Sequence, residues 1–235
     1  MAMRWHDLVF LHWPVPAATL RPLIPRSLTV DTFDGHAWIG IVPFRMTGVR
    51  PRCVPSLPWL SAFAELNVRT YVTVEDKPGV WFFSLDAANP VAVRAARRTF
   101  HLPYYDARIS LTYHDGWIRY RSRRTHRGAP DADLIATYRP VATVATEWAT
   151  REYWLTSRYC LYTVDRSHRV WRGEIDHDPW PLQAAEVKIE VNSMTESLGI
   201  GPLKGDPLAH FARRLDVVAW SLDEVSEGGP ARQRF

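Results

Sequence analysis

The chain has 235 residues with a hydrophobic fraction of 46% and a charged fraction of 23%, which is typical of a globular protein with a substantial core rather than a disordered chain. The net charge of +4 is only mildly basic, and three lysines, Lys77, Lys188 and Lys204, stand among the 29 basic residues, so few amines are available for Schiff-base chemistry. Two cysteines are too few for a disulfide scaffold, and no apolar run reads as a signal peptide or a membrane span. We therefore expect a cytoplasmic protein that does not bind membranes.

The first third of the chain predicts one short helix and several strands. Residues 13–25 are bracketed by prolines, which suits a short helix. Strands are predicted at 36–46, after the turn signal Asp34-Gly35, and at 65–74 and 80–85, on either side of a turn at 76–79. In the 65–74 strand, alternation puts Glu65, Asn67, Arg69 and Tyr71 on one face and apolar residues on the other.

The middle and end of the chain continue this pattern. Asn89-Pro90 reads as an N-cap followed by a first helical residue, and this helix ends in the stretch TFHLPYYDAR, residues 99–108. A hairpin through His114-Asp115-Gly116 follows. One more short helix is predicted within 146–155, and the remaining strands are predicted at 106–114, 117–124, 158–165, 170–176, 186–192 and 214–222.

We expect a mainly β (α+β) fold in which one strongly curled antiparallel sheet forms a cone or barrel with a few short helices. No linker or repeat divides the chain. The predicted organisation is a single domain over residues 1–226, followed by a flexible tail over 227–235.

The chain lacks the sequence motifs of several classes of protein function. The chain contains no GxGxxG, GxxxxGK[ST] or GxSxG sequence, and its histidines never fall at HxH or HxxxH spacing, so we expect neither a metal nor a nucleotide cofactor. Arg119, Arg121 and Arg123 alternate along one predicted strand. A basic stripe of this kind can bind nucleic acid, but the solvated face of an edge hairpin gives the same pattern, and we favour that interpretation.

The polar row Glu65-Asn67-Arg69-Tyr71 is the strongest candidate site. In an open sheet this face meets water and the row is ordinary. In a closed barrel it points inward, where a carboxylate, an amide and a guanidinium in one line form a preorganised polar surface. The pattern does not specify which face lies inside.

Several phrases, in order along the chain, resemble those of the YqjF-like family of uncharacterised proteins, within the acetoacetate decarboxylase-like superfamily. They are AWIGIVPF at 37–44, ELNVRTYV at 65–72, GVWFFSLD at 79–86, LPYYDAR at 102–108 and PWPL at 179–182. The resemblance covers nearly the whole chain. It implies a cone-like barrel of antiparallel strands around a central cavity, but no settled activity.

True acetoacetate decarboxylases carry an aromatic-Pro-Lys-Lys segment that supplies the Schiff-base lysine, with a second lysine that lowers the pKa of the first. The corresponding segment here is Leu102-Pro103-Tyr104-Tyr105. Phenols replace both amines, so the resemblance implies a protein without the Schiff-base lysine, which is not a true decarboxylase.

Two functions follow as expectations. The first is an enzyme that acts on a carbonyl or carboxylate compound by acid–base chemistry, with Glu65, Tyr104 and Tyr105 as catalytic groups and Asn67, Arg69, Tyr71 and Arg108 as substrate-binding groups. The second is a non-catalytic protein that binds an organic anion or aromatic molecule in the same cavity. The expected partner is a small organic ligand, such as a keto acid, rather than nucleic acid; self-association into a homo-oligomer stays open.

Overall fold

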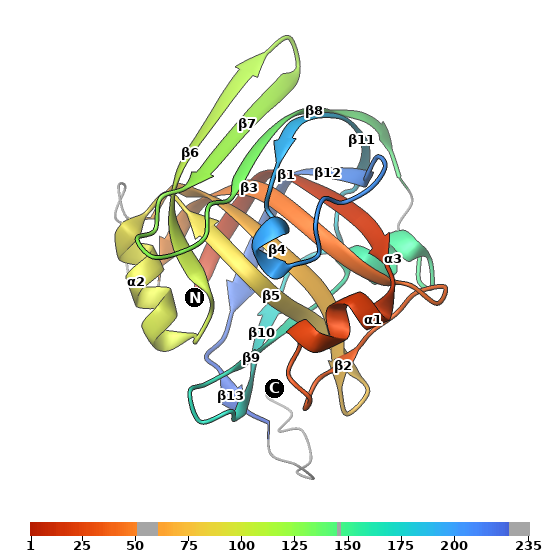
Figure 1. Cartoon of the computed structure of the whole chain (residues 1–235). Helices are drawn as coiled ribbons and strands as arrows, with labels where there is room; N and C mark the ends of the chain where they lie inside the picture. The colour runs from red at the N-terminus through yellow and green to blue at the C-terminus, as the bar shows by residue number, and fades with distance from the viewer. Residues whose placement is uncertain (51–60, 145–146, 226–235) are drawn as a thin grey trace.

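The computed structural model describes residues 1–50, 61–144 and 147–225, and these fold around one thirteen-stranded sheet (Figure 1). The predicted tail at 227–235 lies outside the described residues. The strands are β1 (Ala2–Val15), β2 (Thr29–Val30), β3 (Ala37–Arg50), β4 (Phe63–Val74), β5 (Lys77–Ala87), β6 (Tyr104–His114), β7 (Trp117–Arg124), β8 (Asp133–Thr143), β9 (Cys160–Val164), β10 (Val170–Asp176), β11 (Gln183–Asn192), β12 (Leu208–Ala219) and β13 (Asp223–Glu224).

Helices are few and short, as predicted. They are α1 (Ala17–Leu20), α2 (Pro90–Thr99), α3 (Arg151–Thr156) and two 3-10 turns at Arg21–Leu23 and Glu196–Leu198. No helix in the described part of the chain is long and apolar enough to cross a membrane. The mainly β character expected from the sequence is confirmed.

The sheet closes on itself in two ways because several strands pair with three neighbours. One path of hydrogen-bonded strands runs β5–β6–β7–β8–β11–β12–β1–β3–β4 and returns to β5; we call it the large ring. A second path runs β5–β9–β10–β12–β1–β3–β4 and also returns to β5; we call it the small ring. The strands from β12 to β5 belong to both rings and form a shared wall with an enclosed interior on each side.

Each interior has its own apolar core. Leu66 and Val68 of β4 pack with Tyr120 and Tyr138 in the core of the large ring. Phe10, Val42, Phe44 and Trp180 belong to a second cluster on the other face of the shared wall. A strand with a core on both faces buries side chains on both, so most of its positions are apolar and the alternation with polar residues is lost.

The first strand shows the consequence. From Asp7 to Trp13 every residue of β1 is buried, so its sequence does not alternate. The alternation rule predicts no strand before residue 13, and it fails here because a strand in the shared wall has no solvent face. The short edge strands β2 and β13, and β8, were also not predicted.

Three tight turns connect strands that are consecutive in the chain. Positive φ angles occur at Asp34 and Gly35 (50° and 75°) and at Asp115 and Gly116 (47° and 77°), which confirms both predicted turn signals. The turn predicted at 76–79 was misplaced, because the left-handed residues are Glu75 and Asp76. Gly79 instead lies within β5, where a Cβ would come within 2.9 Å of Tyr162 and Cys160 atoms.

Helix α2 begins as its sequence predicts. The Asn89 side chain accepts hydrogen bonds from the backbone N–H groups of Val91 and Ala92, at 3.0 and 3.1 Å, and Pro90 is the first helical residue. In Figure 1 the helix lies beside the start of β6 and crosses from β5 to it. This crossover makes the β5–β6 pairing parallel, an exception in the mostly antiparallel sheet.

Candidate functional site

A cavity of about 360 Å³ lies inside the small ring, between the shared wall, α2, β9 and β10. Its wall is largely apolar, and aromatic side chains make up much of it. Prominent lining residues are Trp5, Phe44, Phe63, Phe82, Leu85 and Leu161.

Polar groups also lie among the lining residues, and three of them are close in the fold: Glu65 and Asn67 from β4, and Tyr104 from the start of β6. Alternation along β4 puts Glu65 and Asn67 on the cavity face and Leu66 and Val68 on the large-ring face. The parallel pairing of Leu85 with Tyr104 places the phenol next to β4, one strand away. Of the four residues in the polar row, Glu65 and Asn67 therefore face the cavity.

The Tyr104 hydroxyl donates a hydrogen bond to Glu65 Oε2 at 2.9 Å. Glu65 is 3% exposed, and burial raises the pKa of its carboxyl group to about 8, against the lowering effect of the Tyr104 hydrogen bond. Burial and the neighbouring carboxyl group raise the pKa of Tyr104 well above its ordinary value. At neutral pH the site therefore holds a protonated carboxyl group and a neutral phenol.

Asn67 lies two residues further along the same face and is also buried. Its Oδ1 atom has no hydrogen-bond partner among the described residues. A buried amide oxygen without a partner is costly, and such atoms usually face a ligand or water. Asn67 can thus accept a hydrogen bond from a hydroxyl or amino group in the cavity.

Tyr105 points to the opposite face of β6 from Tyr104, because neighbouring residues of a strand alternate. Its ring lies 4.3 Å from the guanidinium carbon of Arg124 and packs edge-on against His126. Arg124 in turn forms a buried ion pair with Asp86, with Nε 2.9 Å from Oδ1. The structure therefore does not bring Tyr105 to the cavity; it covers this ion pair instead.

Arg69 and Tyr71, the second half of the polar row, are not among the lining residues of the cavity. The Tyr71 hydroxyl donates to the Leu155 carbonyl oxygen and bonds His12 Nε2, each at 2.7 Å. The Arg69 guanidinium lies over the rings of Phe10 and Tyr71, at 5.1 and 5.8 Å. They form a separate polar cluster further along β4.

The remaining predicted residue, Arg108, and the three lysines lie elsewhere. Arg108 is exposed on β6, in register with Arg123 of β7. Lys188 and Lys204 are exposed, and the Lys77 ammonium bonds Glu174 at 2.5 Å. None of these side chains is part of the cavity wall.

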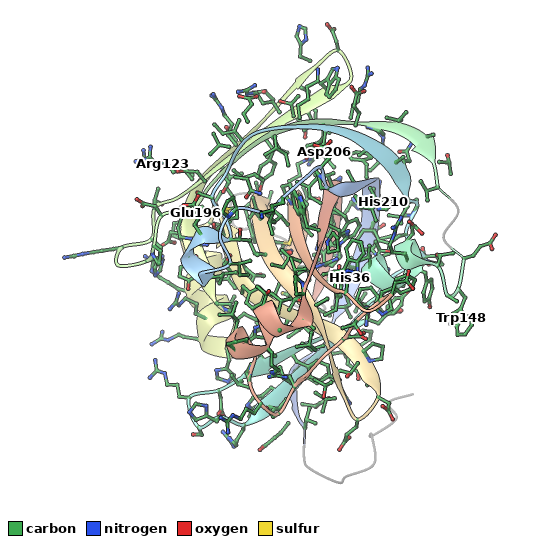
Figure 2. All side chains as sticks on the ribbon, turned by 45° about the vertical axis from the view of Figure 1, so that its right-hand side comes forward. His36, Arg123, Trp148, Glu196, Asp206 and His210 are labelled. Atoms are coloured by element: carbon green, nitrogen blue, oxygen red, sulfur yellow. The ribbon has the colours of Figure 1, made fainter. Side chains whose placement is uncertain are left out.

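The basic stripe on β7 is an outer face on which Arg119 and Arg123 have acidic partners. Arg119 forms two hydrogen bonds of 2.6 Å with Glu190 of β11. Arg123, labelled on the outside of the molecule in Figure 2, lies 3.9 Å from Asp133. In the described ranges, no cluster of three or more His, Cys, Asp or Glu side chains is placed to hold a metal ion.

Sequence reasoning missed the contribution of α2. Val91, Ala92, Ala95, Ala96 and Thr99 form one stripe of this helix and line the cavity. Their spacing of three to four residues is a signal in the sequence, but it reads as ordinary core packing until the cavity beneath the helix is known.

Comparisons with known proteins agree with this fold. The model of a family described as "Uncharacterized conserved protein", DUF2071, matches residues 2–216. "Uncharacterized protein YqjF" from Bacillus subtilis strain 168 is 44% identical over 227 residues, which cover 96% of this chain and 93% of that protein.

Solved structures with a similar fold include enzymes. The enduracididine biosynthesis enzyme MppR complexed with pyruvate has a TM-score of 0.64 at 11% identity, over 97% of this chain and 92% of that one. Acetoacetate decarboxylase from Legionella pneumophila has a TM-score of 0.61 at 12% identity, over 96% and 88%. An acetoacetate decarboxylase-like enzyme from Sphingomonas wittichii RW1 has a TM-score of 0.64 at 12% identity, over 95% and 92%. At these identities the likeness concerns the fold alone.

Proposed function

The chain belongs to the DUF2071 family and has an acetoacetate decarboxylase-like fold, and from this premise we propose that it is a small-molecule enzyme that acts on a carbonyl compound by acid–base chemistry. The observation that carries the proposal is the Tyr104–Glu65 hydrogen bond of 2.9 Å in the wall of an apolar cavity. A carboxyl group whose pKa is about 8 is suited to donate and recover a proton near neutral pH.

The chemistry assigned to the pair is enolisation. The protonated Glu65 donates its proton to the carbonyl oxygen of the ligand, a proton leaves the neighbouring carbon to solvent, and the released electron pair forms the enol double bond. The Tyr104 O–H then stabilises the Glu65 carboxylate, since it already donates to Oε2. Asn67 orients the ligand by accepting a hydrogen bond at its free Oδ1.

Schiff-base chemistry is not part of the proposal. Tyr104 and Tyr105 take the positions that the resemblance assigns to the paired lysines, and a phenol cannot form an iminium with a keto group. The positions of Lys77, Lys188 and Lys204 outside the cavity wall support the same conclusion.

The second candidate is a binding protein that uses the same cavity without turnover. The apolar character of the wall favours it, because such a wall holds an aromatic or aliphatic ligand with few polar contacts. It differs from the first candidate in predicting ligand binding without any proton exchange at the ligand.

Proton exchange in deuterated water distinguishes the two. A panel of 2-keto acids, 3-keto esters and diketones is incubated with the protein, and loss of the α-proton signal is followed by NMR. We expect catalysed exchange for some member of the panel, and a loss of rate of about 100-fold or more in Glu65→Gln and Tyr104→Phe.

Tyr105→Phe is the matched control, because that phenol lies on the opposite face of the same strand, and it is expected to keep the wild-type rate. Equal rates in Glu65→Gln and the wild type would contradict the proposed role of Glu65. Ligand-induced shifts without exchange for any member of the panel would favour the binding protein.

A further inference from the structure

The sheet forks at β5, and the fork leaves an opening in its edge. On one edge β5 pairs with β4 along its length. On the other edge it pairs with β9 only at Val80 and Trp81, and with β6 only from Leu85 to Ala87. Residues 82–84 thus have no strand partner on that edge in the described chain, at the place where the large and small rings separate.

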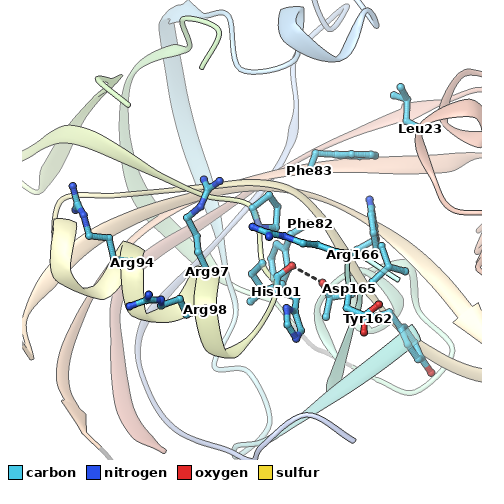
Figure 3. A pocket seen from close by; sticks show the side chains of 15 residues that line it. Leu23, Phe82, Phe83, Arg94, Arg97, Arg98, His101, Tyr162, Asp165 and Arg166 are labelled. Atoms are coloured by element: carbon cyan, nitrogen blue, oxygen red, sulfur yellow. Dashed lines mark hydrogen bonds between the residues drawn. The ribbon is translucent and has the colours of Figure 1, made fainter. Parts of the chain in front are cut away.

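A groove of about 740 Å³ lies at this fork (Figure 3). Its apolar part is formed by side chains of β5, of the segment after α2 and of β9, namely Trp81, Phe82, Phe83, Leu102, Pro103 and Tyr162. The Thr163 hydroxyl donates to the His101 carbonyl oxygen at 2.8 Å, which is the dashed line in Figure 3. This bond ties β9 to the segment after α2 beside the groove.

Four arginines line the same groove: Arg94, Arg97 and Arg98 from α2, and Arg166 from the β9–β10 turn. In Figure 3 Arg166 extends toward the helix that carries the other three. The Arg97 guanidinium is held by the Tyr104 carbonyl oxygen at 2.6 Å, a bond that fixes its position without neutralising its charge.

The positive charge of the groove is largely uncompensated. Arg94 lies 3.6 Å from Asp106, but among the described residues no carboxylate forms an ion pair with Arg97, Arg98 or Arg166. The one acidic lining residue, Asp165, is already paired with Arg169 at 2.7 Å and accepts a hydrogen bond from Trp171. Several guanidinium groups that line one groove without counterions favour a ligand with more than one negative charge.

The groove adjoins the cavity that contains Glu65. Phe82 and Leu102 line both spaces, and α2 borders both with different faces. Its arginine stripe lines the groove, while Ala92 and Ala96 belong to the stripe that lines the cavity. The two spaces therefore share two apolar lining residues, beside an unpaired stretch of strand.

We propose that the groove is the outer half of one continuous binding site, which takes an amphiphilic ligand with a multiply charged anionic head group. The arginines bind the head group, a phosphate or a polycarboxylate, and the apolar part of the ligand passes Phe82 and Leu102 into the inner cavity. This inner part of the ligand carries the carbonyl group that Glu65 protonates, and that one statement rests on the proposed function.

The experiment measures binding of defined probes by isothermal titration calorimetry. Inorganic pyrophosphate and citrate test the head-group site, and methyl phosphate and octyl phosphate test whether an alkyl chain adds affinity. We expect pyrophosphate, citrate or both to bind, with affinity that falls as salt rises and falls at least about ten-fold in the double variant Arg97→Gln/Arg166→Gln. Arg121→Gln, an exposed arginine of β7, is the matched control and keeps the wild-type affinity.

The alkyl chain of octyl phosphate tests whether the groove and the cavity form one continuous binding site. Octyl phosphate is expected to bind at least about ten-fold more tightly than methyl phosphate, because the chain buries apolar surface in the cavity. Ala96→Trp, which fills the cavity from an accessible helix position, is expected to remove this gain and leave pyrophosphate or citrate affinity unchanged.

Equal binding of the head-group probes to the wild type and the double arginine variant, or no binding at all, would overturn the head-group site. A chain-length gain that survives Ala96→Trp would overturn the continuous site. These readouts involve neither Glu65 nor turnover, so a failure of the proposed chemistry is distinguishable from a failure of the anion site.

Discussion

At the scale of single residues, the neighbouring side chains of Tyr104 and Tyr105 lie on opposite faces of β6. Tyr104 bonds a buried, protonated carboxyl group in the cavity, whereas Tyr105 covers the ion pair of Arg124 and Asp86. Burial raises the pKa of Asp86 to about 6, although Arg124 opposes this effect. Burial thus raises the pKa of both Glu65 and Asp86, which lie on neighbouring strands, and it raises that of Asp86 less because Arg124 stabilises its charge.

The raised pKa of Glu65 predicts a stability that depends on pH. Between the ordinary value of 4.5 and the native value of about 8, the unfolded chain has lost the Glu65 proton and the native protein has kept it. The free energy of unfolding therefore falls as pH rises through this window. We expect a fall of about 3 kcal/mol between pH 5.5 and 8 from this group alone.

Urea denaturation of the wild type and Glu65→Gln at both pH values checks this, since the variant cannot ionise and other groups contribute equally to both proteins. A pH dependence that is the same in the two proteins would show that Glu65 ionises normally in the folded state.

At the scale of elements, α2 connects the cavity to the groove. Only Val93 of this helix is fully buried, so its position depends on its cap and on the small residues packed over the cavity. The bonds from Val91 and Ala92 to the Asn89 side chain satisfy two backbone donors at its first turn. A poorly anchored helix at this place would widen both spaces at once.

We expect Asn89→Ala to destabilise the protein by about 1 kcal/mol, because both N–H groups lose their acceptor. Thermal unfolding measures the effect. Asn89→Asp keeps an acceptor oxygen at the same position and is expected to retain wild-type stability; if the two variants were equally destabilised, the side-chain cap would not be what holds the start of α2.

At the scale of the whole molecule, closure of the small ring depends on the short parallel contact between β5 and β9. Gly79 lies at this contact, with space for no side chain: a Cβ would come within 2.7 Å of Tyr162 Cε2 and 2.9 Å of the Cys160 carbonyl oxygen. The backbone of β9 can approach β5 only because this residue is glycine.

Gly79→Ala is therefore expected to destabilise the fold by about 1–3 kcal/mol, because the backbone of β9 must move away. Gly173→Ala is the matched control on β10: its Cβ would meet the flexible end of Leu222 at 3.0 Å, so its cost should be smaller. Equilibrium unfolding in urea compares the two, and a larger loss in Gly173→Ala would contradict the importance of the β5–β9 contact.

The sequence alone predicted the features that depend on local interactions. The mainly β class, the hairpin at Asp115-Gly116 and the cap at Asn89 follow from turn, capping and alternation rules, and the structure confirms them. The family resemblance, on motifs spread along the chain, is confirmed as well. Alternation also placed Glu65 and Asn67 on one face of β4.

Only the tertiary structure determined whether a given strand face borders solvent, a core or a cavity. Closure of the sheet in two rings buried β1 on both sides and removed its alternation. Closure also directed Glu65 into the cavity, left Arg69 outside the cavity wall and brought Arg166 to the arginines of α2. The alternation of polar and apolar residues along a strand indicates that its two faces differ. What each face contacts depends on strands that are distant in the sequence.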